Sequence, residues 1–83
     1  MSAQDVGVSA EIYNLRGLKC PLPVLKTQKK LRDLTSGERI WVETDDPLAV
    51  IDVPHFCQEK SHPLIEMVEL DDGGHRFLIE RGA

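Results

Sequence analysis

The order of apolar and polar positions along the chain predicts short strands that alternate with helices. Residues 9–15 alternate imperfectly between apolar and polar side chains, which predicts a short strand that ends in a turn at Gly17. In residues 21–34 the apolar side chains recur every three or four positions, which predicts a helix that Gly37 terminates. Residues 38–44 alternate again and predict a second strand.

The second half of the chain predicts one more helix and a hairpin. Asp52 is suited to cap a short helix that continues to about residue 60, because the proline two positions later would fall in its first turn. Residues 64–70 and 76–81 have strand character. Residues 71–74, Asp-Asp-Gly-Gly, stand between them and are a strong hairpin-turn signal.

Together these elements predict an α+β fold. We expect a two-layer α/β sandwich in the order β-α-β-α-β-β, with two helices on one face of a mixed four-stranded sheet. Residues 1–8 should form a flexible N-terminal tail and residues 9–83 a single domain. The first strand, helix and second strand form a βαβ unit, so these two strands should be parallel. Because parallel strands end at the same edge of a sheet, Cys20 should lie near Asp45 and Asp46.

The composition is typical of a small soluble protein of the cytoplasm. The 83 residues are 41% hydrophobic and 29% charged, which is ordinary for a globular domain. We expect neither a signal peptide nor a membrane segment, because no basic segment followed by an apolar run opens the sequence and no apolar run has the length of a membrane span. The two cysteines make no disulfide framework, which favours a reducing compartment.

The net charge of −4 hides an uneven distribution of charge. Residues 16–32 contain no acid, whereas the chain as a whole has 14 acidic residues. The basic residues of this segment are Arg16, Lys19, Lys26, Lys29, Lys30 and Arg32. Two interpretations stay open, a solvated helix face and a docking patch for an acidic partner. Direct binding of nucleic acid is not expected, because the domain is acidic and no aromatic residues are interleaved with these bases.

The candidate chemistry lies in residues 18–23, Leu-Lys-Cys-Pro-Leu-Pro. Proline is tolerated at the first helical position, which puts Cys20 at or next to the N-cap of the helix. Free backbone N–H groups and the helix dipole, with Lys19, should then lower the pKa of this thiol. A fall from about 8.5 to about 7 would raise the thiolate fraction at pH 7 from roughly 3% to half. The alternative is a small capping cysteine without chemistry.

The other residues that carry chemistry point to structural roles. Cys57 lies on an apolar stripe and is expected in the core. The three histidines are scattered and neither cysteine belongs to a Cys-x-x-Cys pair, so we expect no metal site. Asp45 and Asp46 act as turn formers or caps, or help to orient a partner. They are not activating groups, because a nearby carboxylate opposes the ionisation of a thiol.

Residues 14–23, Asn-Leu-Arg-Gly-Leu-Lys-Cys-Pro-Leu-Pro, resemble the signature of the TusA-like (SirA-like) family of sulfur carriers. The similarity continues through three later segments, residues 44–47, 52–57 and 76–79. Two positions depart from the family pattern. Leu22 stands where the best-known tRNA-thiolation carriers have glutamate, and Asn14 stands where aspartate is common.

The resemblance implies that Cys20 accepts sulfane sulfur as a persulfide. The supporting motif would consist of Gly17, Lys19, Pro21, Leu22 and Pro23. The implied partners are a cysteine desulfurase or rhodanese-type donor and a downstream acceptor protein, in tRNA thiolation, molybdenum cofactor assembly or sulfur oxidation. The resemblance thus implies a carrier without a cofactor rather than a stand-alone enzyme.

Two hypotheses of other classes stay open. The first is a regulatory or interaction module that uses the basic helix and the open face of the sheet without thiol chemistry. The second is a thiol redox sensor in which Cys20 forms a disulfide, with Cys57 as its resolving thiol only if the two sulfurs are close.

Overall fold

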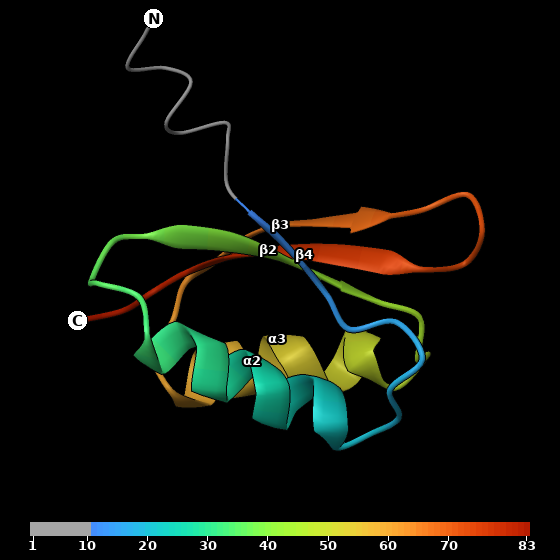
Figure 1. Ribbon diagram of the computed structural model, residues 1–83, viewed down its shortest axis with the longest axis horizontal. Helices are drawn as coiled ribbons and strands as arrows, with labels where there is room; N and C mark the ends of the chain where they lie inside the picture. The colour runs from blue at the N-terminus through green and yellow to red at the C-terminus, as the bar shows by residue number, and fades with distance from the viewer. Residues whose placement is uncertain (1–10) are drawn as a thin grey trace, which may run out of the picture.

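The computed structural model describes residues 11–83 and has the predicted order of strands and helices (Figure 1). The elements are β1 (Ile12–Asn14), α2 (Leu22–Arg32), β2 (Arg39–Thr44), α3 (Ala49–Glu59), β3 (Leu64–Glu69) and β4 (His75–Glu80). The predicted tail at residues 1–8 and the first two residues of the predicted strand lie outside the described residues. The observed order confirms the β-α-β-α-β-β prediction.

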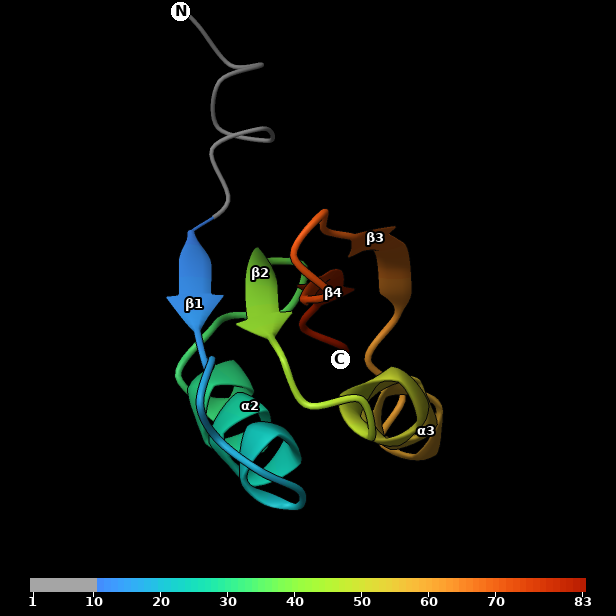
Figure 2. The same cartoon turned by 90° about the vertical axis from the view of Figure 1, so that its right-hand side faces the viewer.

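The four strands form one mixed sheet in the order β1-β2-β4-β3. Strands β1 and β2 are parallel, and the β2–β4 and β3–β4 pairs are antiparallel. Both helices lie side by side on one face of this sheet (Figures 1 and 2). The two-layer α+β fold and the parallel first pair are therefore confirmed. The parallel pair brings the ends of β1 and β2 to the same edge.

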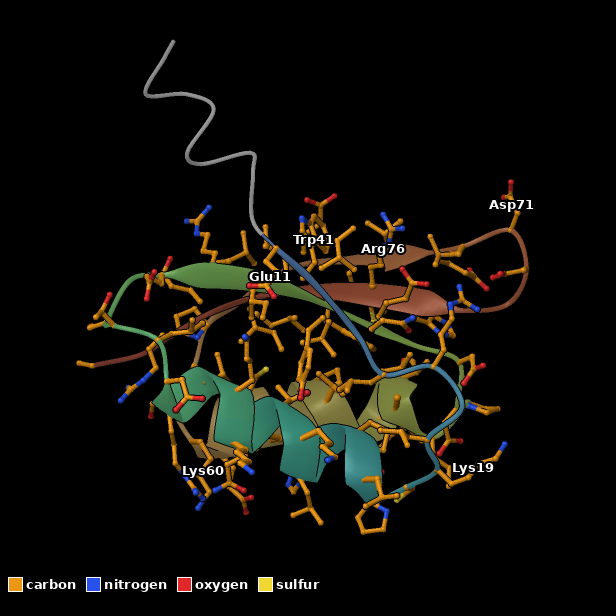
Figure 3. The ribbon with its side chains drawn as sticks, in the orientation of Figure 1. Glu11, Lys19, Trp41, Lys60, Asp71 and Arg76 are labelled. Carbon is orange, nitrogen blue, oxygen red and sulfur yellow. The ribbon has the colours of Figure 1, made fainter. Side chains whose placement is uncertain are left out.

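The core fills the space between the helices and the sheet. In β2 the side chains of Ile40, Val42 and Thr44 are buried, as the alternation predicts. Trp41 and Arg76 lie on the opposite face, which neither α2 nor α3 covers (Figure 3). The buried apolar residues are Leu15, Leu31, Ile40, Val42, Ala49, Val53, Phe56, Cys57, Phe77 and Ile79. The prediction that Cys57 belongs to the core is confirmed.

Helix α2 is shorter than predicted at both ends. It begins at Leu22, with Pro21 as the N-cap, and its C-cap is Asp33. Gly37 does not terminate it, and instead adopts a φ of +92° in the turn before β2. In that turn its N–H donates to the carbonyl of Arg81, which ties the turn to the end of the chain.

Helix α3 begins earlier than predicted, and the prediction that Asp52 caps it is wrong. Its N-cap is Leu48, and Asp52 lies within the first turn. The N–H of Leu48 donates to Oδ1 of Asp46 at 3.1 Å, and the N–H of Ala49 donates to the Asp46 carbonyl at 2.9 Å. An aspartate that accepts these N–H groups starts the helix at once. The carboxylate of Asp52 is thereby left for another contact.

Glu43 connects β2 to β4 and to the loop before α2. Its carboxylate accepts hydrogen bonds from Nε of Arg16 and, at 2.7 Å, from Nε of Arg76. Arg16 also donates to Asp72 in the β3–β4 turn at 3.2 Å. The Glu43 side chain is only 13% exposed. The hydrogen bonds from Arg16 and then Arg76 lower the pKa of this carboxyl below its ordinary value.

Replacing Glu43 tests how much this charged cluster stabilises the fold. We expect Glu43→Gln to lower the free energy of unfolding at pH 7 by about 1–2 kcal/mol, because both guanidinium groups lose a charged acceptor. Since the pKa of Glu43 is lowered in the folded protein, its contribution is complete above the unfolded pKa of about 4.3 and disappears as the pH falls through the folded value.

Urea denaturation at pH 7 and at pH 3 measures this difference, with the exposed Glu69→Gln as the matched control. A loss at pH 7 no larger than that of the control would contradict the role of Glu43.

Candidate functional site

The loops that follow β1 and β2 are joined by two aspartate side chains. The N–H of Gly17 donates to Oδ1 of Asp45 at 2.9 Å, and the N–H of Cys20 donates to Oδ2 of Asp46 at 2.6 Å. Gly17 has a φ of +86°, a conformation that favours glycine, so the chain turns there toward α2. The predicted proximity of Cys20 to Asp45 and Asp46 is therefore confirmed.

Asp46 is the buried member of the pair and fixes two chain segments at once. It is only 5% exposed, and its two carboxylate oxygens accept the N–H groups of Cys20 and Leu48. These hydrogen bonds, with a smaller contribution from the charge of Lys19, lower the pKa of the Asp46 carboxyl. The carboxylate thus holds the backbone of Cys20 against the start of α3.

The side chain of Cys20 is exposed, and it lies one residue before the N-cap of α2. The Cys20–Pro21 peptide bond is cis. Few backbone donors are left for the sulfur at this helix end. Pro21 and Pro23 have no N–H, and the N–H of Leu22 donates to the carbonyl of Lys19 at 2.8 Å.

The predicted lowering of the Cys20 pKa is wrong. Its Sγ donates a hydrogen bond to Oδ2 of Asp52, 2.8 Å away in the first turn of α3. This hydrogen bond, together with partial desolvation and the negative charges of Asp52 and Asp46, raises the pKa of the thiol. The helix end provides too few N–H donors to offset these carboxylates. The sulfur of Cys20 is therefore a hydrogen-bond donor to a carboxylate, which opposes its ionisation.

Asp52 is the residue of this site that the sequence analysis assigned to another role. Its position within residues 52–57, one of the segments that carry the family resemblance, was the available signal. The contact with Cys20 could not be deduced from periodicity, because it depends on where α3 begins.

The basic residues near Cys20 fall into two groups. Arg16 is held by Glu43, and Lys30 lies over the Tyr13 ring with its Nζ 5.5 Å from the ring centroid and 3.8 Å from the Glu11 carboxylate. The second group is exposed on the loop and on α2 and comprises Lys19, Lys26, Lys29 and Arg32. Figure 3 shows Lys19 at the loop that leads into α2. Of the six basic residues predicted near Cys20, only those of the second group are exposed.

Exposed apolar side chains lie at the starts of the two helices that meet near Cys20. Leu22 and Leu25 begin α2, and Leu48 and Ile51 begin α3. Leu22 is 42% exposed and Ile51 is 67% exposed. Of these four, only Leu22 is a site residue that the sequence predicts. Their positions at the starts of both helices place an apolar rim beside the thiol.

The second cysteine and the open pocket lie toward the other end of α3. The pocket has a volume of about 340 Å³ and is lined by residues that include Cys57, His62 and Leu64. Burial raises the pKa of Cys57 to about 11. Within residues 11–83 no cluster of three His, Cys, Asp or Glu side chains is arranged to hold a metal ion. In the same residues, no helix combines the length and the apolar character needed to cross a membrane.

Two comparisons relate the chain to known proteins. The family model described as Sulfurtransferase TusA matches residues 11–81. Among solved structures, the SirA-like protein from Desulfitobacterium hafniense is similar, with a TM-score of 0.76 and 23% sequence identity. That similarity covers 88% of this chain and 99% of the other chain. It shows that the two proteins share a fold.

Replacing Asp45 or Asp46 should change the hydrogen exchange of different backbone amides. We expect Asp46→Ala to speed amide hydrogen exchange at Cys20 and Leu48 by about tenfold or more, because both N–H groups lose their acceptor. Asp45→Ala should instead affect the amide of Gly17. In the wild type, protection by Asp46 should persist until the pH falls through its lowered pKa.

Exchange measured by NMR at pH 7 provides this test, and each variant is the control for the other. Unchanged protection of the Cys20 amide in Asp46→Ala would show that Asp46 does not fix this segment.

Proposed function

Because the chain belongs to the TusA sulfurtransferase family, we propose that it is a sulfur carrier that takes up sulfane sulfur as a persulfide on Cys20. The family match carries this proposal, since it spans residues 11–81 and so includes Cys20 and the loops that hold it. The exposed position of the thiol supports it, because a group that passes between proteins must be accessible. In this proposal the motif residues between Gly17 and Pro23 turn the chain from β1 into α2 and leave the Sγ of Cys20 exposed to solvent.

Cys20 is better suited to this role than Cys57. The thiolate is the nucleophile in sulfur exchange. Burial raises the pKa of Cys57 to about 11, so this thiol is neutral and inaccessible at pH 7. The same properties make Cys57 a poor resolving thiol, which argues against a redox sensor that relies on it.

The surroundings of Cys20 suit a carrier whose partners supply the activation. Its N–H donates to Asp46 and its Sγ donates to Asp52. In residues 11–83 no group donates a hydrogen bond to Sγ, so nothing described there stabilises the thiolate. A donor enzyme that presents a persulfide would have to provide that stabilisation during the transfer.

The proposed relay has a donor and an acceptor protein. The donor would be a cysteine desulfurase or a rhodanese-type enzyme, and the acceptor would determine whether sulfur enters tRNA thiolation, molybdenum cofactor assembly or sulfur oxidation. The uncharged Leu22 beside the thiol favours partners with an apolar contact. The relay would operate in the cytoplasm, without a membrane or nucleic acid as a direct partner.

Persulfide formation on Cys20 is the direct test of this function. After incubation with a cysteine desulfurase and cysteine, we expect intact mass spectrometry to show one added sulfur atom on the wild type and none on Cys20→Ser. Cys57→Ala is the matched control and should keep the added sulfur, because its remaining thiol is Cys20. Absence of added sulfur on the wild type with both donor classes, or equal addition on Cys20→Ser, would refute the proposal.

The exposed bases of α2 are proposed as the docking surface for the donor. We expect Lys29→Glu to slow sulfur uptake from the donor enzyme about two- to fivefold at low salt, with a smaller difference at high salt, because steering by surface charge is screened. Uptake from glutathione persulfide should not change. Lys60→Glu, at the far end of α3, is the control of equal charge (Figure 3). If sulfur uptake slowed equally in both variants, the proposed docking surface on α2 would be contradicted.

A further inference from the structure

We propose that Asp52 keeps Cys20 in its neutral form in the free carrier, and that a cationic side chain of the sulfur donor frees the thiolate by pairing with this carboxylate. This inference rests on the proposed function of Cys20. The geometric basis is the 2.8 Å hydrogen bond from Sγ of Cys20 to Oδ2 of Asp52. Asp52 would thereby determine which donors can load the carrier.

A simple general-base role for the carboxylate is less favourable. Between an ordinary carboxylate and an ordinary thiolate, the proton stays on sulfur by a factor of about 10⁴ to 10⁵. The carboxylate therefore holds the S–H more effectively than it removes its proton. The other charged groups near Cys20 do not reverse this balance, since Asp46 adds a second negative charge and Lys19 acts on Asp46.

A cation is the group that would release the thiol. Asp52 is half-buried in the first turn of α3, and Leu48 and Ile51 at the same end of this helix are exposed. A donor docked on this apolar rim would exclude water, and an ion pair strengthens when water is excluded. A lysine or arginine of the donor would then draw the carboxylate into an ion pair and offset its charge beside Sγ.

The transfer that follows is balanced without a further oxidant. The Sγ proton leaves to solvent as the donor approaches, before water is excluded, and the thiolate attacks the outer sulfur of the donor persulfide. The new Sγ–S bond forms while the S–S bond of the donor breaks, and the donor cysteine leaves as a thiolate with the electron pair. The Cys20 sulfur is oxidised as the cysteine sulfur of the donor is reduced.

The first test is the pH dependence of alkylation of Cys20 by iodoacetamide. We expect Asp52→Asn to move the midpoint to lower pH by about one unit and to speed alkylation at pH 7 about three- to fourfold. One unit raises the thiolate fraction tenfold, while the less basic thiolate is about threefold less nucleophilic. Asp71→Asn, at the exposed hairpin turn, removes the same charge and should change nothing (Figure 3).

The wild type provides a measurement that does not depend on the folding of a variant. When alkylation of Cys20 in the wild type is followed by peptide mass spectrometry, its midpoint should be higher in the folded protein than in urea. A folded midpoint at or below the unfolded one, or no shift in a folded Asp52→Asn, would overturn the proposal. These readouts involve no sulfur transfer, so they can fail while persulfide formation on Cys20 succeeds, and the reverse.

The second test addresses the cation. A cationic methanethiosulfonate, with a trimethylammonium group, should modify the wild type several-fold faster than the sulfonate analogue. Asp52→Asn should reduce this ratio, and Asp71→Asn should keep it. An equal ratio in the two variants would show that Asp52 does not select cationic reactants and would overturn that half of the proposal.

Discussion

The carboxylate of Asp46 is the constraint on which the rest of the site depends. One oxygen accepts the N–H of Cys20 and the other accepts the N–H of Leu48. The loop after β1 and the loop after β2 are joined there, which is possible because the parallel pairing ends both strands at one edge. A buried carboxylate must have partners for its oxygens, and these two amides provide them. The backbone of the thiol is therefore fixed while its side chain stays exposed.

The groups that position Cys20 also oppose its ionisation. Asp52 accepts the S–H and Asp46 adds a negative charge nearby, so the pKa of the thiol is raised. Catalytic cysteines that act alone have the opposite surroundings, with cations or several helix N–H groups directed at the sulfur. At the start of α2 two prolines remove such donors and the Leu22 N–H is already bonded. The site thus favours position over activation, which suits a thiol that reacts only beside a partner.

Much of the fold follows from local patterns that the sequence displays directly. The alternation in β2, the Asp-Asp-Gly-Gly turn and the helical spacing of α2 each depend on neighbouring residues, so they predicted the elements and their order along the chain. The start of α3 and the pKa of Cys20 depend on contacts across the sequence instead. The hydrogen bonds to Asp46 make α3 begin at Ala49, three residues before Asp52. This start of the helix places the Asp52 carboxylate beside a cysteine 32 positions away in the sequence. Spacing along the chain contains no information on such a contact.

The contacts in the structure show which of the charged side chains near Cys20 are paired and which are exposed. The sequence suggests a basic flank around Cys20, yet Arg16 is held by Glu43 and Lys30 by Tyr13 and Glu11. The side chain that accepts a hydrogen bond from the sulfur is acidic, and of the exposed lysines Lys19 lies on the adjacent loop while Lys26 and Lys29 lie farther along α2. In the relay proposed above, a partner would meet two surfaces in sequence, first a basic helix that attracts an acidic face at long range and then an acidic thiol edge that requires a cation at contact. Such a division lets one small carrier bind its partners weakly and still discriminate between them at the step where sulfur moves.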